Sequence, residues 1–198
     1  MKPAIGLLLS LVMVSAGAQD APPLEPAILL TISGEKTWAI GIDGQAVSFH
    51  LRHPHQHVTI SARLGNGGGH AFADAYLMKE IGPGTTESDE IARIAFDLVY
   101  PFEGWVDLFQ DLDLEAGTYW LVIARPPEKA HTSINWFVAQ PLTTSGSCSV
   151  AYLDSKSYSF RSDAAEYIPA SKFEKKYQPY GFQFEVWEMR MPGGEACP

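Results

Sequence analysis

The chain has 198 residues, of which 46% are hydrophobic and 12% aromatic, a composition typical of a folded globular protein. It carries 23 Asp plus Glu against 14 Lys plus Arg, and its formal net charge is −9. Such an acidic surface repels nucleic-acid phosphates and anionic lipid headgroups, so we expect no nucleic-acid partner.

The N-terminus has the order of a cleaved secretory signal. Lys2 supplies a positive charge, Ile5 to Val14 form a short apolar stretch, and Ala16-Gly17-Ala18 fits a signal-peptidase site. We expect residues 1–18 to be a signal peptide cleaved after Ala18, and the protein to be secreted into the extracellular space or the periplasm. No segment reaches the roughly 20 apolar residues of a spanning helix, so no membrane span is predicted.

The next eight residues, 19–26, contain three prolines and predict a short extended leader, because proline cannot continue a helix. Residues 27–198 are then expected to form one domain, since their number suits a single hydrophobic core.

Most of this domain has a hydrophobic period of two, which is typical of half-buried antiparallel strands. The apolar residues alternate with polar ones in three segments: Val47-Phe49-Leu51, Val58-Ile60-Ala62 and Phe182-Phe184-Val186. Four further runs are apolar on both parities and predict central strands covered on both sides: 27–32, 91–99, 119–124 and 134–138.

Turn residues separate these runs. Asp43-Gly44 is a hairpin signal, 65–69 is a glycine-rich loop, and Gly82-Pro83-Gly84 and Ala116-Gly117 are tight turns. We find no convincing amphipathic helix. The predicted fold is all-β: a two-sheet antiparallel β-sandwich, jelly-roll-like, with little or no helix after the signal peptide.

The two cysteines, Cys148 and Cys197, predict a disulfide bond, because an even count in an exported chain is first explained by pairing. Closing a loop of about 50 residues would stabilise the fold by roughly 4 kcal/mol on the chain-entropy model. Two free thiols are the alternative.

Three stretches resemble a known group of proteins: Val58 to Leu64, Ile81-Gly82-Pro83-Gly84-Thr85-Thr86, and Asp113 to Val122. They are similar to exported bacterial β-sandwich proteins, many of which carry a PEP-CTERM sorting tail. The resemblance implies an exported, non-catalytic, β-rich protein associated with extracellular polysaccharide. The segment from Met191 to Pro198 has no Pro-Glu-Pro motif, apolar helix or basic end, so sorting and surface anchoring are not carried over.

A histidine-rich segment suggests a metal site. If the chain is extended here, His53, His55 and His57 project from one side, because side chains two apart share a face of a strand. Three imidazoles could hold zinc or copper, with His70 or Asp74 as a further ligand. The alternative is a polar hairpin tip between 49–51 and 58–60, in which Pro54 makes the turn.

Acidic residues gather in two groups that could supply oxygen ligands to calcium. The groups are Asp107, Asp111, Asp113 and Glu115, and Glu87, Asp89 and Glu90. Neither has the spacing of a dedicated calcium loop, so solvated strand faces are the alternative. No cofactor is expected otherwise.

Catalysis is not predicted, and no catalytic residue is assigned. Glu103 beside Gly104-Trp105 is the best candidate acid for glycoside hydrolysis, but the sequence does not identify a partner carboxylate. A Gly-x-Ser-x-Gly nucleophile elbow is absent from the sequence.

Trp187 is the candidate ligand platform. It alternates with the buried residues of its strand, so its ring is expected to face outward and to stack on a sugar. Packing beneath a loop is the alternative. Trp105, Trp120 and Trp136 are expected in the core. The predicted function is that of a non-catalytic, polysaccharide-associated or carbohydrate-binding protein. The alternatives are a structural or surface-interaction protein without a small ligand and, less favoured, a secreted glycoside hydrolase.

Overall fold

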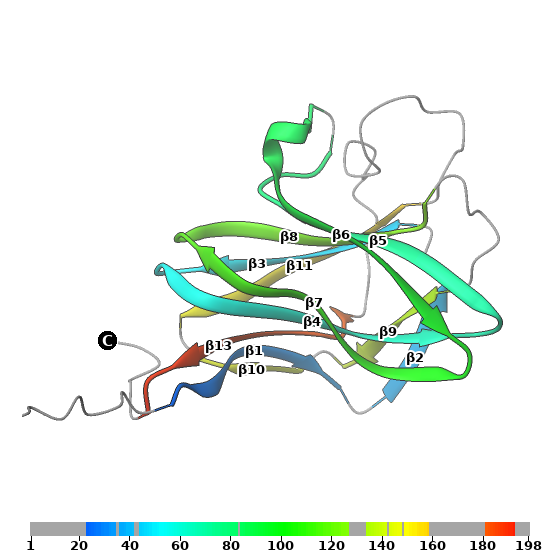
Figure 1. Ribbon diagram of the computed structural model, residues 1–198, viewed down its shortest axis with the longest axis horizontal. Helices are drawn as coiled ribbons and strands as arrows, with labels where there is room; N and C mark the ends of the chain where they lie inside the picture. Colours follow the sequence, from blue (N-terminus) through cyan, green and yellow to red (C-terminus); the bar gives the residue numbers. More distant parts are fainter. Residues whose placement is uncertain are drawn as a thin grey trace, which may run out of the picture.

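The structure, a computed structural model, describes residues 23–34, 36–41, 44–82, 84–126, 134–141, 143–147, 149–158 and 181–192. The signal peptide and most of the leader lie outside these residues. The described strands form two antiparallel sheets packed against each other, as the sequence predicts (Figure 1). The part of the chain that the structure describes contains no helix long and apolar enough to cross a membrane.

Within the described residues, the large sheet has eight strands. They are β1 (Glu25–Ser33), β2 (Lys36–Gly41), β4 (His55–Asn66), β7 (Phe102–Leu114), β9 (Ile134–Gln140), β10 (Thr143–Gly146), β12 (Gly181–Phe182) and β13 (Phe184–Arg190). Their main path is β10-β1-β13-β4-β9-β12, with β7 paired to β4 and β2 paired to β9.

The small sheet has the order β11-β3-β8-β5-β6. Its strands are β3 (Gly44–Leu51), β5 (His70–Met78), β6 (Glu90–Val99), β8 (Gly117–Ala124) and β11 (Val150–Tyr158). One 3₁₀ turn, η1 (Glu87–Asp89), precedes β6, and Thr86 and Asp89 close it with a reciprocal cap.

The core lies between the sheets and confirms the three alternating segments. The alternating apolar residues of β3, of β4, and of β12 with β13 all belong to one buried cluster. Aromatic rings join the sheets: Phe49 of β3 lies 5.9 Å from Phe184 of β13, centroid to centroid. Burying these side chains supplies most of the driving force for folding.

The connections correct the turn predictions. Asp43-Gly44 predicts a hairpin, but β2 pairs with β9 in the large sheet while β3 pairs with β8 and β11 in the small one. The predicted glycine-rich loop 65–69 is shorter in the structure, because Gly65 and Asn66 end β4, and residues 67–69 lead to β5 in the other sheet. A turn signal shows where the chain bends and does not show which strands pair, so the hairpin prediction was wrong.

The prediction for 91–99 was also wrong. This segment is β6, the edge strand of the small sheet, and much of its length is exposed. In contrast, 119–124 forms β8 between β3 and β5, as expected for a central strand. The finer expectation of a jelly roll remains a prediction.

Candidate functional site

The outer face of the large sheet carries a row of polar side chains that crosses four strands. Thr31 on β1 is paired with Glu185 on β13, Glu185 with Ser61 on β4, and Ser61 with Asp107 on β7. Paired residues point to the same face of a sheet, so these four side chains lie in one line. We call them the central row.

Hydrogen bonds order this row. The Thr31 hydroxyl donates to Glu185 Oε1 at 3.4 Å, and the Ser61 hydroxyl donates to Asp107 Oδ1 at 2.6 Å. Gln110 Nε2 donates to Asp107 Oδ2 at 3.3 Å. The two carboxylates therefore lie on opposite sides of β4, each held by a neighbouring hydroxyl.

Trp187 lies on the same outer face, as the sequence predicts. It is paired with Thr59, and its indole Nε1 donates to Ser61 Oγ at 3.3 Å, so the ring reaches from its own position to the central row. Thr59 and Ser61 point away from the core yet are only 3% and 2% exposed. We infer that the half-buried indole helps to cover these two hydroxyls.

Trp105 is the second tryptophan of this face, and the sequence prediction that it belongs to the core was wrong. Phe102 and Val106 of β7 pack against the core, which leaves positions 103, 105 and 107 on the outer face, and Trp105 is 42% exposed. It is paired with Arg63 of β4, four residues from the partner of Trp187. The backbone positions of the two tryptophans are thus about 13 Å apart along β4 and two strand spacings apart across it.

We call Trp105, Trp187 and the central row the tryptophan face. Beside it, Arg63 bonds Glu103 Oε1 at 2.8 Å and Gln183 Oε1 at 3.3 Å, and its guanidinium lies 4.8 Å from the centroid of the Phe137 ring. Glu103, the candidate acid of the sequence analysis, is therefore held in an ion pair with Arg63.

The two carboxylates of the face have different surroundings. Burial raises the pKa of Glu185, the Thr31 hydrogen bond lowers it, and the negative charge of Asp107 raises it further. Asp107 is exposed and accepts two hydrogen bonds. Glu185 is thus the carboxyl that holds a proton to higher pH than an ordinary glutamate.

This difference predicts how stability depends on pH. Because the pKa of Glu185 is higher in the folded chain than its ordinary value of 4.5, folding favours the protonated form. The stability that this group contributes is present below pH 4.5 and is lost as pH rises through the folded pKa. We expect Glu185→Gln to have a higher Tm than the wild type at pH 7 and an equal Tm at pH 3.5. A lower Tm at pH 7 would contradict this.

The outer face of the small sheet is different in character. A second apolar cluster is buried there: Ala46, Tyr76, Met78, Val122 and Ala124, with Ile81 and Trp120 packed against it. Asp74 accepts hydrogen bonds from the Tyr76 hydroxyl at 3.1 Å and from Arg93 Nη2 at 2.9 Å, and burial raises the pKa of Tyr76. These polar groups satisfy one another.

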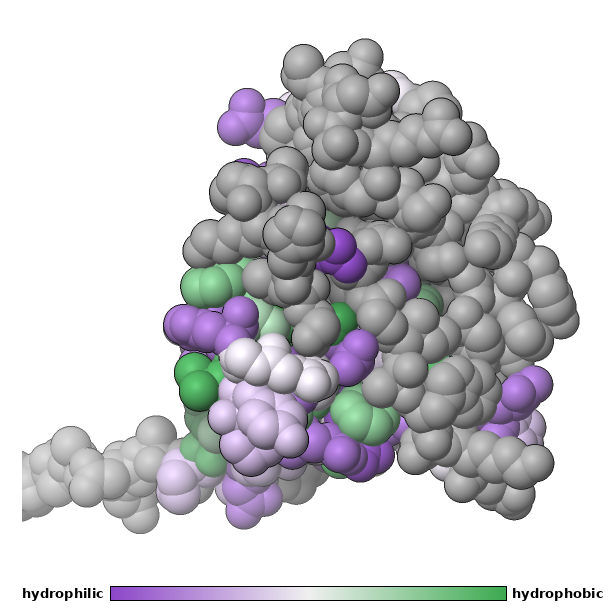
Figure 2. Space-filling model, turned by 90° about the vertical axis from the view of Figure 1, so that its right-hand side faces the viewer, coloured by the Kyte–Doolittle hydropathy of each residue, from purple (hydrophilic) through white to green (hydrophobic). Residues whose placement is uncertain are grey.

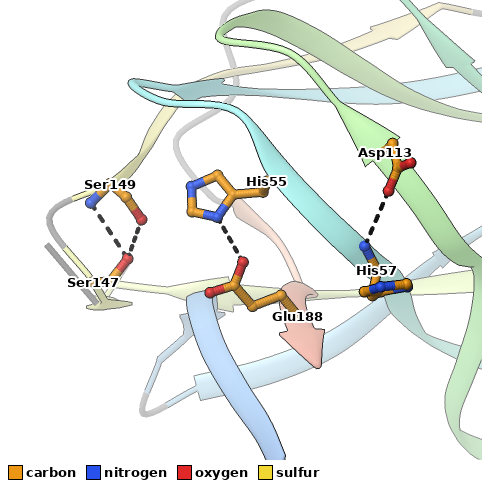
Figure 3. Close-up of polar contacts among 6 residues, drawn as sticks. All are labelled: His55, His57, Asp113, Ser147, Ser149 and Glu188. Atoms are coloured by element: carbon orange, nitrogen blue, oxygen red, sulfur yellow. Dashed lines mark hydrogen bonds and ion pairs between the residues drawn. The ribbon is translucent and has the colours of Figure 1, made fainter. Parts of the chain in front are cut away.

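The three predicted metal ligands have separate surroundings. His53 lies in the exposed bend between β3 and β4, which joins the two sheets and is not the tip of a hairpin. His55 Nδ1 lies 2.7 Å from Glu188 Oε2 on β13, whereas His57 Nδ1 lies 2.6 Å from Asp111 Oδ1 on β7. Figure 3 shows the two rings beside different strands. The hydrogen bond to Asp111 raises the pKa of His57.

The other predicted ligands are also engaged elsewhere. His70 contacts Asp97 of β6, and Asp74 belongs to the Tyr76–Arg93 group. Asp113 accepts a hydrogen bond from the His57 amide at 3.4 Å, and Asp89 caps η1. Among the described residues, no three His, Cys, Asp or Glu side chains lie together in a way that could hold a metal ion.

His55 and Glu188 form a largely buried pair, with side chains only 9% and 14% exposed. The second ring nitrogen of His55, Nε2, is buried without a hydrogen-bond partner among the described residues. We expect Glu188→Ala to lower the free energy of unfolding by about 2 kcal/mol, because it leaves His55 Nδ1 buried and unpaired as well. Urea denaturation measures this loss. The control is Asp111→Asn, at an exposed His–Asp pair, because Asn also adopts the positive φ of 58° at this position, and its change should stay below about 1 kcal/mol. Equal losses would contradict the assigned difference in burial.

The predicted disulfide falls outside the described part of the chain, since neither Cys148 nor Cys197 belongs to it. The flanking serines are described: Ser147 and Ser149 bond each other through their hydroxyls (Figure 3). The disulfide stays a prediction.

Sequence reasoning named Trp187 and missed the rest of the tryptophan face. The sequence did contain a signal for Trp105: it alternates in step with the charged residues Glu103 and Asp107, which indicates that all three share the exposed face of a strand. The sequence contained no signal for the alignment of Glu185 with Asp107, because this alignment depends on the register of three strands. Comparison with protein-family models, with curated proteins and with solved structures gives no match.

Proposed function

We propose that the protein is a secreted carbohydrate-binding protein and that the tryptophan face binds a polysaccharide. The observation that carries this proposal is the position of two tryptophans on one sheet face, on either side of a row of hydroxyls and carboxylates. Sugar rings have apolar faces and polar rims, so aromatic rings stack on the faces while carboxylates bond the rims.

The charge of the face favours a neutral polysaccharide. Glu185 and Asp107 can accept hydrogen bonds from sugar hydroxyls, and they would repel the carboxylates or sulfates of an acidic glycan. The signal-peptide pattern and the resemblance to exported, polysaccharide-associated proteins support an extracellular or periplasmic partner of this kind.

A glycan array with the mature protein and Trp187→Ala tests the proposal. We expect the wild type to bind neutral glycans and the variant to lose most of that signal while keeping its circular dichroism spectrum. Absence of signal from the folded wild type, or equal signal from both proteins, would refute binding through this face.

A structural or surface-interaction role is the second candidate, and the edge strand β6 favours it. Ile94, Val99 and Tyr100 are exposed in or just after this strand. Figure 2 looks at the end of the molecule where β6 leads into β7 and shows hydrophobic residues scattered among hydrophilic ones. Analytical ultracentrifugation separates the candidates, because an edge contact between copies gives concentration-dependent dimers that Val99→Lys abolishes.

A further inference from the structure

The central row contains two carboxylates that could act on a bound sugar as an acid and a base. Glu185 and Asp107 belong to β13 and β7, the two neighbours of β4, and are paired with the same residue, Ser61. Two strand spacings separate their backbones by about 10 Å. Inverting glycoside hydrolases place their carboxyl groups about 6.5–9.5 Å apart, which leaves room for one water molecule beside the sugar.

The two carboxyl groups have different surroundings, which suit them to different roles in the reaction. The Asp107 side chain is exposed, so a water molecule can reach the carboxylate that Ser61 and Gln110 hold in place, as a general base requires. Glu185 lies on the less exposed side, and burial raises its pKa, which suits a group that must donate one. Trp187 contacts Ser61 between the two carboxylates, so a sugar stacked on its indole would lie beside both.

From this geometry we infer that the tryptophan face hydrolyses the glycosidic bond of the polysaccharide it binds, with Glu185 as the general acid and Asp107 as the general base. This inference rests on the proposed function, because the polysaccharide must first bind to the same face. It names the pair of carboxylates that the sequence alone did not identify.

The reaction balances with water as the only co-substrate. The Glu185 carboxyl proton passes to the glycosidic oxygen as the bond from that oxygen to the anomeric carbon breaks. A water molecule attacks the anomeric carbon from the opposite side and gives its proton to the Asp107 carboxylate. Proton exchange with solvent then restores both groups, and the new reducing end has inverted configuration.

The test uses the mature wild-type chain and three variants of similar size: Glu185→Gln, Asp107→Asn and Asp111→Asn. Asp111 is on the same strand as Asp107 but bonds His57, and its positive φ of 58° is one that Asn also adopts, so Asp111→Asn is the matched control. Xylan, mixed-linkage β-glucan, laminarin and starch serve as probes. Affinity gel electrophoresis measures binding to each, a reducing-end assay measures cleavage, and proton NMR identifies the first anomer released.

We expect the wild type and Asp111→Asn to cleave at least one probe that they retard in the gel and to release the inverted anomer. Glu185→Gln and Asp107→Asn should still bind but cleave at least about 100-fold more slowly. Binding without cleavage would overturn this inference and leave the proposed function intact. Cleavage that persists in both carboxylate variants, or release of the retained anomer, would overturn the assignment of the pair. If none of the probes binds, the proposed function fails for these polysaccharides and the inference fails with it.

Discussion

Trp136→Ala should lower the free energy of unfolding by about 3–5 kcal/mol, the largest loss we expect from one substitution. The Trp136 ring is completely buried, lies 4.8 Å from the Phe182 ring and donates its indole Nε1–H to the Gln183 carbonyl at 2.8 Å. Alanine would leave a cavity between the sheets and remove this hydrogen bond. At about 2–4 °C per kcal/mol, the Tm should fall by about 10 °C.

Trp105→Ala is the matched control, because it removes the same side chain from the outer face of the same sheet. Trp105 is 42% exposed, so we expect a loss of about 1 kcal/mol in chemical denaturation, well below that of Trp136→Ala. Similar losses for the two variants would contradict the division of the large sheet into a buried inner face and an accessible outer face.

The double variant Trp105→Ala/Trp187→Ala should lose most of the affinity for the bound polysaccharide. Well-placed aromatic residues contribute about 2 kcal/mol or more to a binding surface, so each ring should account for roughly a thirtyfold change in Kd. Affinity gel electrophoresis with a polysaccharide that the wild type binds measures the combined loss.

Leu153→Ala provides the control for this experiment. Leu153 is an exposed hydrophobic residue of β11, which belongs to the small sheet and not to the sheet that carries the tryptophan face, and its removal should leave the affinity unchanged. A double tryptophan variant that binds as tightly as Leu153→Ala would rule out the outer face of the large sheet as the binding surface.

The fold class could be predicted because the geometry of a strand produces a hydrophobic period of two in the sequence. Val47, Phe49 and Leu51 alternate along the sequence, and a strand sends alternate residues to one side, so their burial follows directly. The pairing of strands could not be predicted. Asp43-Gly44 has the composition of a hairpin, yet β2 and β3 enter different sheets, because packing between the sheets outweighs local turn preference.

The site was predicted only as far as single strands allow. The outward position of Trp187 follows from the period of β13. Its contact with Ser61 joins residues 126 positions apart, and no local pattern contains that information. The same holds for Glu185 and Asp107, which are brought into one row by β4 between them.

The tryptophan face has features that cost stability and suit binding. It keeps Glu185 partly buried with a raised pKa, and it exposes the apolar ring of Trp105. A face with no ligand would gain stability from an uncharged side chain at 185. Glu185→Gln is therefore expected to separate the two properties, with a gain in stability at neutral pH and a loss of the proposed activity.

The most direct test follows the indole Nε1–H signals of the tryptophans by NMR while an oligosaccharide of the bound polysaccharide is added. The signals can be assigned with single Trp→Phe variants. We predict saturable shifts of the Trp105 and Trp187 signals and no shift of the Trp136 signal, which belongs to the buried core. Saturable binding that leaves both the Trp105 and Trp187 signals unmoved would contradict a carbohydrate site on the outer face of the large sheet.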